Sequence, residues 1–267
     1  MRSVSEITLT LKHNQADKAV RSLLDEGVPP DMIFQASERL ERQVRREMAK
    51  SDLFYLVTGP LGYNPRKNPD FVEFGDLHLR MAREMEARNP WTMFMWARGF
   101  CKSTFLIGRI VQDIIRDPDT AGMIASFSAD KAMETFSEVK EHFTVNEEFR
   151  ELFPEFVTRY QNYGDEENFQ VPNRTRPRAE STLTVGSVKK NLVRAHYDFI
   201  DYDDIVVRDS VYDNAQIEKG ISWFRDSLHV TRARARRQIN GTRWAENETY
   251  GWIIENEMNR RKAGRGE

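Results

Sequence analysis

The chain has 267 residues, of which 39% are apolar and 31% are charged, and its formal net charge is −2. Its single cysteine excludes an internal disulfide framework, and no apolar run approaches the roughly 20 residues that a membrane-spanning helix needs. The N-terminus lacks the apolar segment of a signal peptide. We therefore expect a soluble intracellular protein, with no membrane partner, that forms one large domain or one domain with an appendage.

Residues 1–65 are predicted to form a helical N-terminal arm. Apolar residues recur at helical spacing between residues 19 and 24 and again between residues 32 and 44. Turn-forming residues and a proline-containing linker then lead into a predicted core at 66–255, and 256–267 is the start of a lid or linker. The arm either packs on the core as an appendage or contacts DNA or a partner.

Residues 92–115 carry the pattern of a buried strand, a tight loop and a helix. The run 92–96 is apolar, Gly99 lies in the loop, and apolar residues recur at helical spacing after Lys102. This is the layout of a phosphate-binding P-loop. There the first-turn amides and the helix dipole face an anion, the lysine reaches the outer phosphates, and the following hydroxyl ligates magnesium.

The usual P-loop pattern is G-x-x-x-x-G-K-[ST], and here Trp96 and Cys101 occupy its two glycine positions. An ordinary strand–turn–helix with a surface lysine is therefore the alternative at this point. If the P-loop interpretation holds, the helix N-terminus and Lys102 should lower the pKa of the Cys101 thiol. The competing expectation is a buried, inert cysteine.

Further strands and helices alternate along the core. A helix is predicted at 74–88, a strand at 123–128, a helix at 129–143 and a strand at 181–185. Strands that alternate with helices at this spacing predict a parallel sheet with helices on its faces. The polar loop between residues 162 and 180 contains three arginines, which either solvate the surface or contact phosphates: Arg174, Arg176 and Arg178.

A second motif is the extended run 195–204, which ends in Asp203 and Asp204. In a Walker B motif, one such carboxylate holds the water shell of magnesium and its neighbour orients or deprotonates the attacking water. Asp198 and Asp201 interrupt the apolar run, and acidic strand ends also occur without this function. The P-loop pattern about 100 residues earlier favours the Walker B interpretation.

The third motif spans residues 238–251, where a predicted strand enters a Gly-Thr-Arg-Trp turn and a helix follows. Arginines precede it at alternate positions. If this segment is extended, Arg232, Arg234 and Arg236 share one face, because strand side chains alternate with period 2. That face is either a solvated edge or a track that faces phosphates.

With these motifs the chain resembles the ATPase part of the large terminase subunit, the DNA-packaging motor of tailed bacteriophages. The resemblance covers roughly residues 50–255 and rests on 97–104 as Walker A, 197–205 as Walker B, and 239–244 with Tyr250 and Gly251 as the coupling motif. Terminase Walker A motifs commonly relax the first glycine and carry an arginine before the inner one. The departures here are Cys101, where glycine is usual, and Asp204, where many members have glutamate.

The resemblance implies an α/β fold of the additional-strand, RecA-like P-loop type, with a mostly parallel sheet and helices on both faces. It implies hydrolysis of ATP with Mg²⁺ to translocate double-stranded DNA into a procapsid in the host cell cytoplasm. The implied partners are the DNA, further copies of the chain in a ring on a capsid portal, and a small terminase subunit. Such subunits normally continue into an RNase H-like nuclease domain, which these residues do not show, so no nuclease activity is expected from them.

The resemblance also implies residue roles. Lys102 and Ser103 hold phosphates and magnesium, and Asp203 is the magnesium-side carboxylate. Asp204 activates the water. Arg98 senses the γ-phosphate within its own subunit, whereas Arg194 acts as an arginine finger toward the neighbouring one. The nucleotide-binding segment is Arg98, Gly99, Phe100, Cys101, Lys102, Ser103 and Thr104, and the coupling segment is Gly241, Thr242 and Arg243.

Two other classes of function fit parts of the pattern. One is a different P-loop DNA translocase or helicase-like ATPase, although a helicase should show an arginine-bearing motif in a second RecA-like domain. The other is a catalytically impaired nucleotide-binding module, which would fold and bind nucleotide without turnover.

Overall fold

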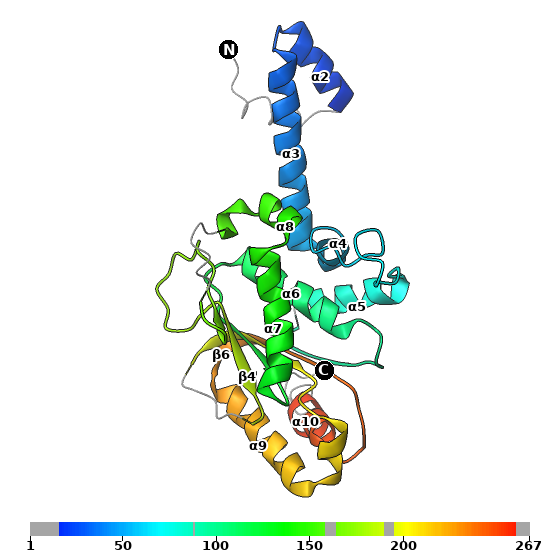
Figure 1. Cartoon of the computed structure of the whole chain (residues 1–267), viewed down its shortest axis with the longest axis vertical. Coiled ribbons are helices and arrows are strands. Elements are labelled where there is room, and N and C mark those ends of the chain that lie inside the picture. Colours follow the sequence, from blue (N-terminus) through cyan, green and yellow to red (C-terminus); the bar gives the residue numbers. More distant parts are fainter. Residues whose placement is uncertain (1–15, 88, 158–163, 190–194, 260–267) are drawn as a thin grey trace. The chain divides into compact units, whose positions relative to one another are not determined.

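The computed structural model describes residues 16–87, 89–157, 164–189 and 195–259 (Figure 1). The chain divides into two compact units, of which the first ends at Asp52 and the second begins at Leu53. Within the described ranges, no helix is both long enough and apolar enough to cross a membrane.

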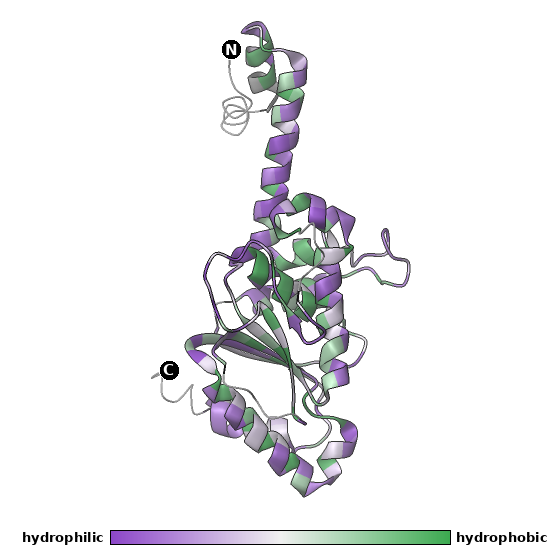
Figure 2. Cartoon of the chain, turned by 60° about the vertical axis from the view of Figure 1, so that its left-hand side comes forward, coloured by the Kyte–Doolittle hydropathy of each residue, from purple (hydrophilic) through white to green (hydrophobic). Residues whose placement is uncertain are grey.

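The first unit is a pair of helices, α2 (Ala16–Asp25) and α3 (Pro30–Ser51). Gly27 adopts a positive φ of 77° in the connection, a conformation that glycine takes without strain. Pro30 begins α3, where its missing amide hydrogen costs no helical hydrogen bond. The helices enclose a small core of Leu23, Val28, Ile33 and Ala36, and the middle turns of α3 are mostly hydrophilic (Figure 2). The helices predicted for this part of the chain are confirmed.

The second unit is built on a six-stranded sheet with the strand order β1-β6-β5-β2-β4-β3. Neighbouring strands are parallel except β3 and β4, which are antiparallel, so the predicted α/β fold with a mostly parallel sheet is confirmed. The strands are β1 (Trp91–Met95), β2 (Gly122–Ser126), β3 (Asn168–Phe169), β4 (Leu183–Ser187), β5 (Tyr197–Asp203) and β6 (Thr231–Gly241).

The helices of the second unit pack against the sheet or against one another (Figure 1). They are α4 (Leu53–Thr58), α5 (Asp76–Glu86), α6 (Lys102–Arg116), α7 (Ala129–Thr144), α8 (Glu147–Leu152), α9 (Asn214–His229) and α10 (Thr249–Ile253), with 3₁₀ turns at Pro154–Phe156 and Arg208–Tyr212 and a π-helical turn at Ile254–Met258.

The side chains of β5 alternate between the two faces of the sheet, as a strand requires. On one face, Tyr202 hydrogen-bonds Ser227 of α9 at 2.7 Å and packs in the core with Phe224. On the other face, Asp203 contacts α6 and α7 through Ser103 and Thr135. Helices therefore cover both faces.

The second unit begins at Leu53, whereas the sequence places the start of the core at residue 66. The difference has a packing cause. Leu53 and Val57 of α4 are buried, and a Cβ built on Gly108 of α6 would lie 2.3 Å from Val57 Cγ2 and 3.2 Å from Leu53 Cδ1. The glycine lets α4 lie directly on α6, which joins residues 53–58 to the core.

The predicted common face of the β6 arginines is wrong, because the strand is irregular at its start. Tyr197 pairs with Thr231 but Phe199 pairs with Arg236, so the intervening β6 residues bulge out of register. Arg232 and Arg234 are exposed, and Arg232 forms an ion pair with Asp198 at 3.4 Å. Arg236 instead points into the protein, where it meets Asp201.

Candidate active site

The three predicted motifs meet at one edge of the sheet. Their strands β1, β6 and β5 run parallel, so their carboxyl ends lie together, which is where open α/β sheets usually bind ligands. The register pairs Met95 with Gly241 and Asp203 with Asn240. The loop after β1, the pair of carboxylates after β5 and the Gly-Thr-Arg turn after β6 are therefore neighbours.

The loop between β1 and α6 contains two residues in the left-handed region, Gly99 with φ 83° and Cys101 with φ 52°. Cys101 stands at the second glycine position of the P-loop pattern and adopts the backbone conformation that favours glycine there. Its Sγ lies 3.9 Å from the Gly99 carbonyl oxygen. Burial raises the pKa of the Cys101 thiol, so the predicted lowering of this pKa is wrong.

Lys102 is a buried residue, 7% exposed, and not a surface lysine. Its Nζ donates to the Trp96 carbonyl oxygen at 3.2 Å and to Thr242 Oγ1 at 2.9 Å. It also lies 3.8 Å from Asp204 Oδ1. The Lys102 ammonium thus joins the loop, the carboxylate pair and the turn after β6.

Asp203 is buried, and its two oxygens have different surroundings. Oδ2 accepts hydrogen bonds from Ser103 Oγ at 3.1 Å and from Thr135 Oγ1 at 3.3 Å. Oδ1 is buried without a hydrogen-bond partner in the described part of the chain. Burial and the neighbouring Asp204 carboxylate raise the pKa of Asp203 to about 6, against the opposing effects of Ser103, Lys102 and Thr135.

These oxygens fit a magnesium ion. Mg²⁺ prefers oxygen ligands and usually takes only one or two from the protein, with phosphates and waters completing its shell. The Ser103 hydroxyl oxygen and the unpaired Oδ1 of Asp203 supply such oxygen ligands. They lie beside Lys102, whose ammonium can hold phosphates. Among the described residues, no cluster of three His, Cys, Asp or Glu side chains could hold a metal by itself.

Asp204 also occupies the left-handed region, with φ 46°. Backbone hydrogen bonds hold it on two sides: its amide donates to Asn240 O at 2.9 Å, and its carbonyl accepts from Phe127 N at 3.4 Å. The Asp204 side chain is 50% exposed. Strained backbone of this kind gathers at functional sites, and here it turns the chain directly after the buried Asp203.

The remaining predicted residues line the same edge. The Arg98 guanidinium carbon lies 5.1 Å from the centroid of the Trp244 ring, which connects the loop after β1 to the segment after β6. Phe100 is half-buried with its ring 6.0 Å from that of Trp96, and Thr104 is half-buried in the first turn of α6. Arg243 is exposed and donates to the carbonyl oxygens of Ala245 and Glu246.

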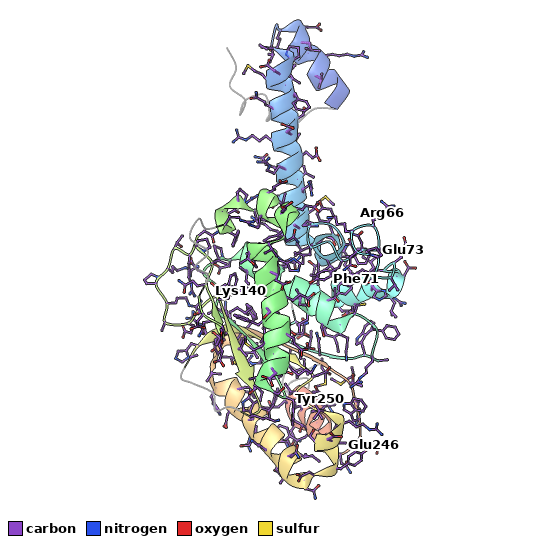
Figure 3. The ribbon with its side chains drawn as sticks, in the orientation of Figure 1. Arg66, Phe71, Glu73, Lys140, Glu246 and Tyr250 are labelled. Carbon is purple, nitrogen blue, oxygen red and sulfur yellow. The ribbon has the colours of Figure 1, made fainter. Side chains whose placement is uncertain are left out.

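Gly241 is held against α10. A Cβ at this position would lie 2.5 Å from the hydroxyl of Tyr250 (Figure 3), so a larger residue would push the aromatic ring away. Tyr250 is fully buried, and its hydroxyl accepts a hydrogen bond from Val206 N at 3.4 Å. Tyr250 thus connects the residues that follow β5 with the end of β6.

The loop arginines that either solvate the surface or contact phosphates, Arg174, Arg176 and Arg178, contact groups away from this edge. Arg194 lies outside the described residues. Arg176 donates to Asp119 at 3.0 Å, and Arg178 forms an ion pair with Asp198 at the start of β5. Arg174 donates to the carbonyl oxygens of Glu180 and Thr120. These arginines therefore fasten the loop 174–180 to the amino end of the sheet, opposite the three motifs.

Two polar residues at this edge are not among the predicted site residues. Thr135 of α7 contacts Asp203. Asn240 of β6 is fully buried and pairs in register with Asp203 of β5. Thr135 could have been noticed as a polar residue on the apolar face of its helix, next to Phe136. Asn240 could have been noticed as an uncharged polar residue at the end of a buried strand.

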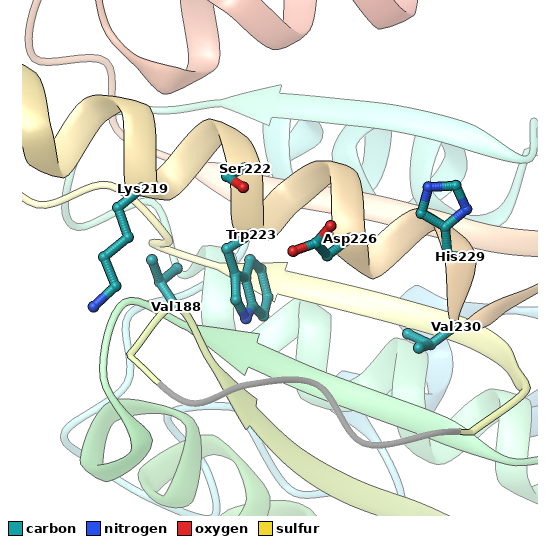
Figure 4. A pocket seen from close by; sticks show the side chains of 7 residues that line it. All are labelled: Val188, Lys219, Ser222, Trp223, Asp226, His229 and Val230. Atoms are coloured by element: carbon teal, nitrogen blue, oxygen red, sulfur yellow. The ribbon is translucent and has the colours of Figure 1, made fainter.

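A separate pocket of 370 Å³ lies along α9 (Figure 4). Trp223 and Asp226 contribute to its wall from one side of this helix. No residue of the three motifs lines this pocket. It is therefore separate from the candidate active site at the carboxyl ends of β1, β6 and β5, which we call the motif edge. The lining residues are Val188, Lys219, Ser222, Trp223, Asp226, His229 and Val230.

Comparison with protein-family models and with curated proteins finds no family and no relative that matches the chain.

Proposed function

We propose that this chain is the ATPase motor domain of a large terminase subunit, which hydrolyses ATP with Mg²⁺ to move double-stranded DNA. The observation that carries the proposal is the convergence on Lys102. One buried ammonium reaches Thr242 at 2.9 Å and Asp204 at 3.8 Å, and the adjacent Ser103 donates to Asp203. The order β1-β6-β5 adds support, because additional-strand P-loop ATPases also have one strand between the P-loop strand and the Walker B strand.

In this proposal each residue has a chemical task. The amides at the start of α6 and the ammonium of Lys102 bind the phosphates. The Ser103 hydroxyl and Asp203 hold Mg²⁺, which when bound neutralises charge that develops on the phosphoryl oxygens. Asp204 orients the attacking water and accepts its proton. Arg98 leaves the ring of Trp244 to reach the γ-phosphate.

The DNA-translocating part of the proposal comes from the sequence resemblance, with further copies of the chain and a small terminase subunit as partners. The motif edge itself supports nucleotide chemistry. A catalytically impaired nucleotide-binding module is the second candidate, because Cys101 replaces a glycine and Asp204 is one methylene shorter than the glutamate of many terminases.

Phosphate release from ATP, measured with and without double-stranded DNA, tests the proposal. We expect Mg²⁺-dependent turnover that DNA stimulates. Lys102→Ala should lower the turnover by about 100-fold or more, because it removes charge stabilisation of the transition state. The matched control is Lys131→Ala, which changes an exposed lysine paired with Glu134 on α7. Nucleotide binding without turnover would support the impaired module, and equal turnover of both variants would contradict the site assignment.

A further inference from the structure

Helix α7 contributes a hydroxyl to the motif edge. The helix starts directly after β2, where Ser128 caps it by accepting a hydrogen bond from Lys131 N. Thr135 follows in the second turn, is 6% exposed, and lies on the same helix face as the buried Ala132 and Phe136. Its Oγ1 donates to Asp203 Oδ2 at 3.3 Å.

A hydroxyl on an apolar helix face is costly unless it is hydrogen-bonded, and here the partner is the Asp203 carboxylate. Thr135 and Ser103 both donate to Oδ2 of Asp203, from two different helices. Two donors on one oxygen fix the rotation of the carboxylate. The other oxygen, Oδ1, is left buried and without a hydrogen-bond partner in the described part of the chain, available to a cation.

We propose that Thr135 is a positioning residue for magnesium, which holds Asp203 with Oδ1 toward the ion or its water shell. This inference rests on the proposed function. In this site the Ser103 hydroxyl oxygen also ligates the ion. Thr135 lies outside the P-loop, on α7, and acts on the ion through its hydrogen bond to Asp203. Residues that orient metal ligands in this way typically change metal affinity or activity by about 10- to 100-fold when they are removed.

The test compares nucleotide binding with and without the ion. The dissociation constant of a fluorescent ADP analogue is measured in excess Mg²⁺ and in EDTA. The constant in EDTA divided by the constant in Mg²⁺ reports how strongly the ion strengthens nucleotide binding. In Thr135→Val we expect this ratio to shrink by about 10- to 100-fold, with the constant in EDTA unchanged. Thr135→Ser keeps the hydroxyl and should restore most of the wild-type ratio.

Thr144→Val is the matched control, because this threonine of the same helix donates to backbone carbonyl oxygens, at 3.0 Å to Lys140 O and at 3.5 Å to Glu141 O. It should keep the wild-type ratio.

A wild-type ratio in Thr135→Val would overturn the inference. An equal loss of nucleotide affinity in EDTA and in Mg²⁺ would overturn it too, because it would mean a general structural role. If Thr135→Val does not fold, Thr135→Ala carries the same expectation. A wild-type chain that binds no nucleotide under either condition would instead contradict the proposed function, and the inference would fall with it.

Discussion

Cys101 shows how backbone conformation explains a departure from a motif. The P-loop pattern has glycine before the lysine, and Cys101 at this position adopts φ 52°, a conformation that glycine takes without strain. A left-handed conformation costs an L-residue roughly 1–2 kcal/mol, so the folded chain holds Cys101 in this conformation at that cost. The residue at this position is not glycine, but its backbone has the conformation that favours glycine.

Substitutions at Cys101 should therefore follow backbone preference. Cys101→Gly relieves the left-handed strain and should retain nucleotide affinity. Cys101→Val places a β-branched side chain at positive φ and should weaken nucleotide binding and lower the free energy of unfolding by about 1–2 kcal/mol. Urea unfolding and nucleotide titration measure both effects, with Cys101→Ala as the control that only removes the thiol. Equal stability of the Val and Ala variants would show that the loop does not need this conformation.

At the scale of elements, a buried histidine connects α7 to the loop that follows α4. His142 Nε2 lies 2.9 Å from the Tyr63 hydroxyl, which donates to Glu138 at 2.7 Å. Asn146 Nδ2 lies 3.0 Å from His142 Nδ1, so Nδ1 is an acceptor and the ring is neutral. Burial lowers the pKa of His142 to about 4.

This pKa predicts a pH-dependent part of the stability. An unfolded histidine has a pKa of about 6.5, so as the pH falls below this value the unfolded chain takes up the proton and the folded chain does not. The contribution of His142 is fully present above pH 6.5 and is lost as the pH falls toward 4. We expect the unfolding free energy to drop by about 2 kcal/mol more between pH 7 and pH 5 in the wild type than in His142→Gln. Urea titrations at the two pH values measure the difference, and parallel losses in both proteins would contradict the assignment.

The sequence predicted the elements that carry strong apolar patterns. The strand and helix around Lys102, the strand before Asp203 and helix α7 all appear within a few residues of the predicted ranges, because each carries a run or a helical face of apolar residues. No helix is predicted at α9. Small residues, Gly220 and Ser227, occupy buried positions in this helix, which weakens its hydrophobic periodicity.

Contacts between distant segments were harder to predict. Thr135 and Asp203 are 68 residues apart in the chain, and only the packing of α7 on the sheet brings them together. The bulge in β6 likewise depends on its pairing with β5 and separates arginines that a regular strand would align. The sequence therefore indicated which strand ends carry the candidate site, but not the helix that also contributes a side chain to it.

At the scale of the whole molecule, a buried ion-pair network ties α6 to the middle of the sheet. Arg236 makes two hydrogen bonds to Asp201, at 2.6 and 2.7 Å, and Asp201 is 0% exposed. Arg236 Nε also donates to Asp113 of α6 at 3.0 Å, and Asp113 pairs with Arg109 at 3.0 Å. Burial opposes the charge on Arg236, but Asp201 and Asp113 outweigh it and raise the pKa of Arg236. This network accounts for the aspartate that interrupts the apolar run of β5.

Breaking the network should be costly, because it would leave the Asp201 carboxylate buried and unpaired. We expect Arg236→Met to lower the unfolding free energy by about 3–5 kcal/mol. Arg232→Met, on the same strand, removes an exposed ion pair and should cost less than about 1 kcal/mol. The double variant Arg236→Met/Asp201→Leu should recover part of the loss. Similar stabilities of the two single variants in urea would refute the structural importance of the pair.

The central claim is that one Mg²⁺–nucleotide binds at the motif edge through Lys102, and calorimetric titration with a slowly hydrolysed ATP analogue in Mg²⁺ tests it most directly. We predict one bound nucleotide per chain. Lys102→Ala should weaken the affinity by about 10- to 100-fold, because it removes a charged hydrogen bond to phosphate, while Lys131→Ala keeps the wild-type affinity. A wild-type chain that binds no nucleotide, or a Lys102→Ala variant that binds it as tightly as the wild type, would contradict the claim.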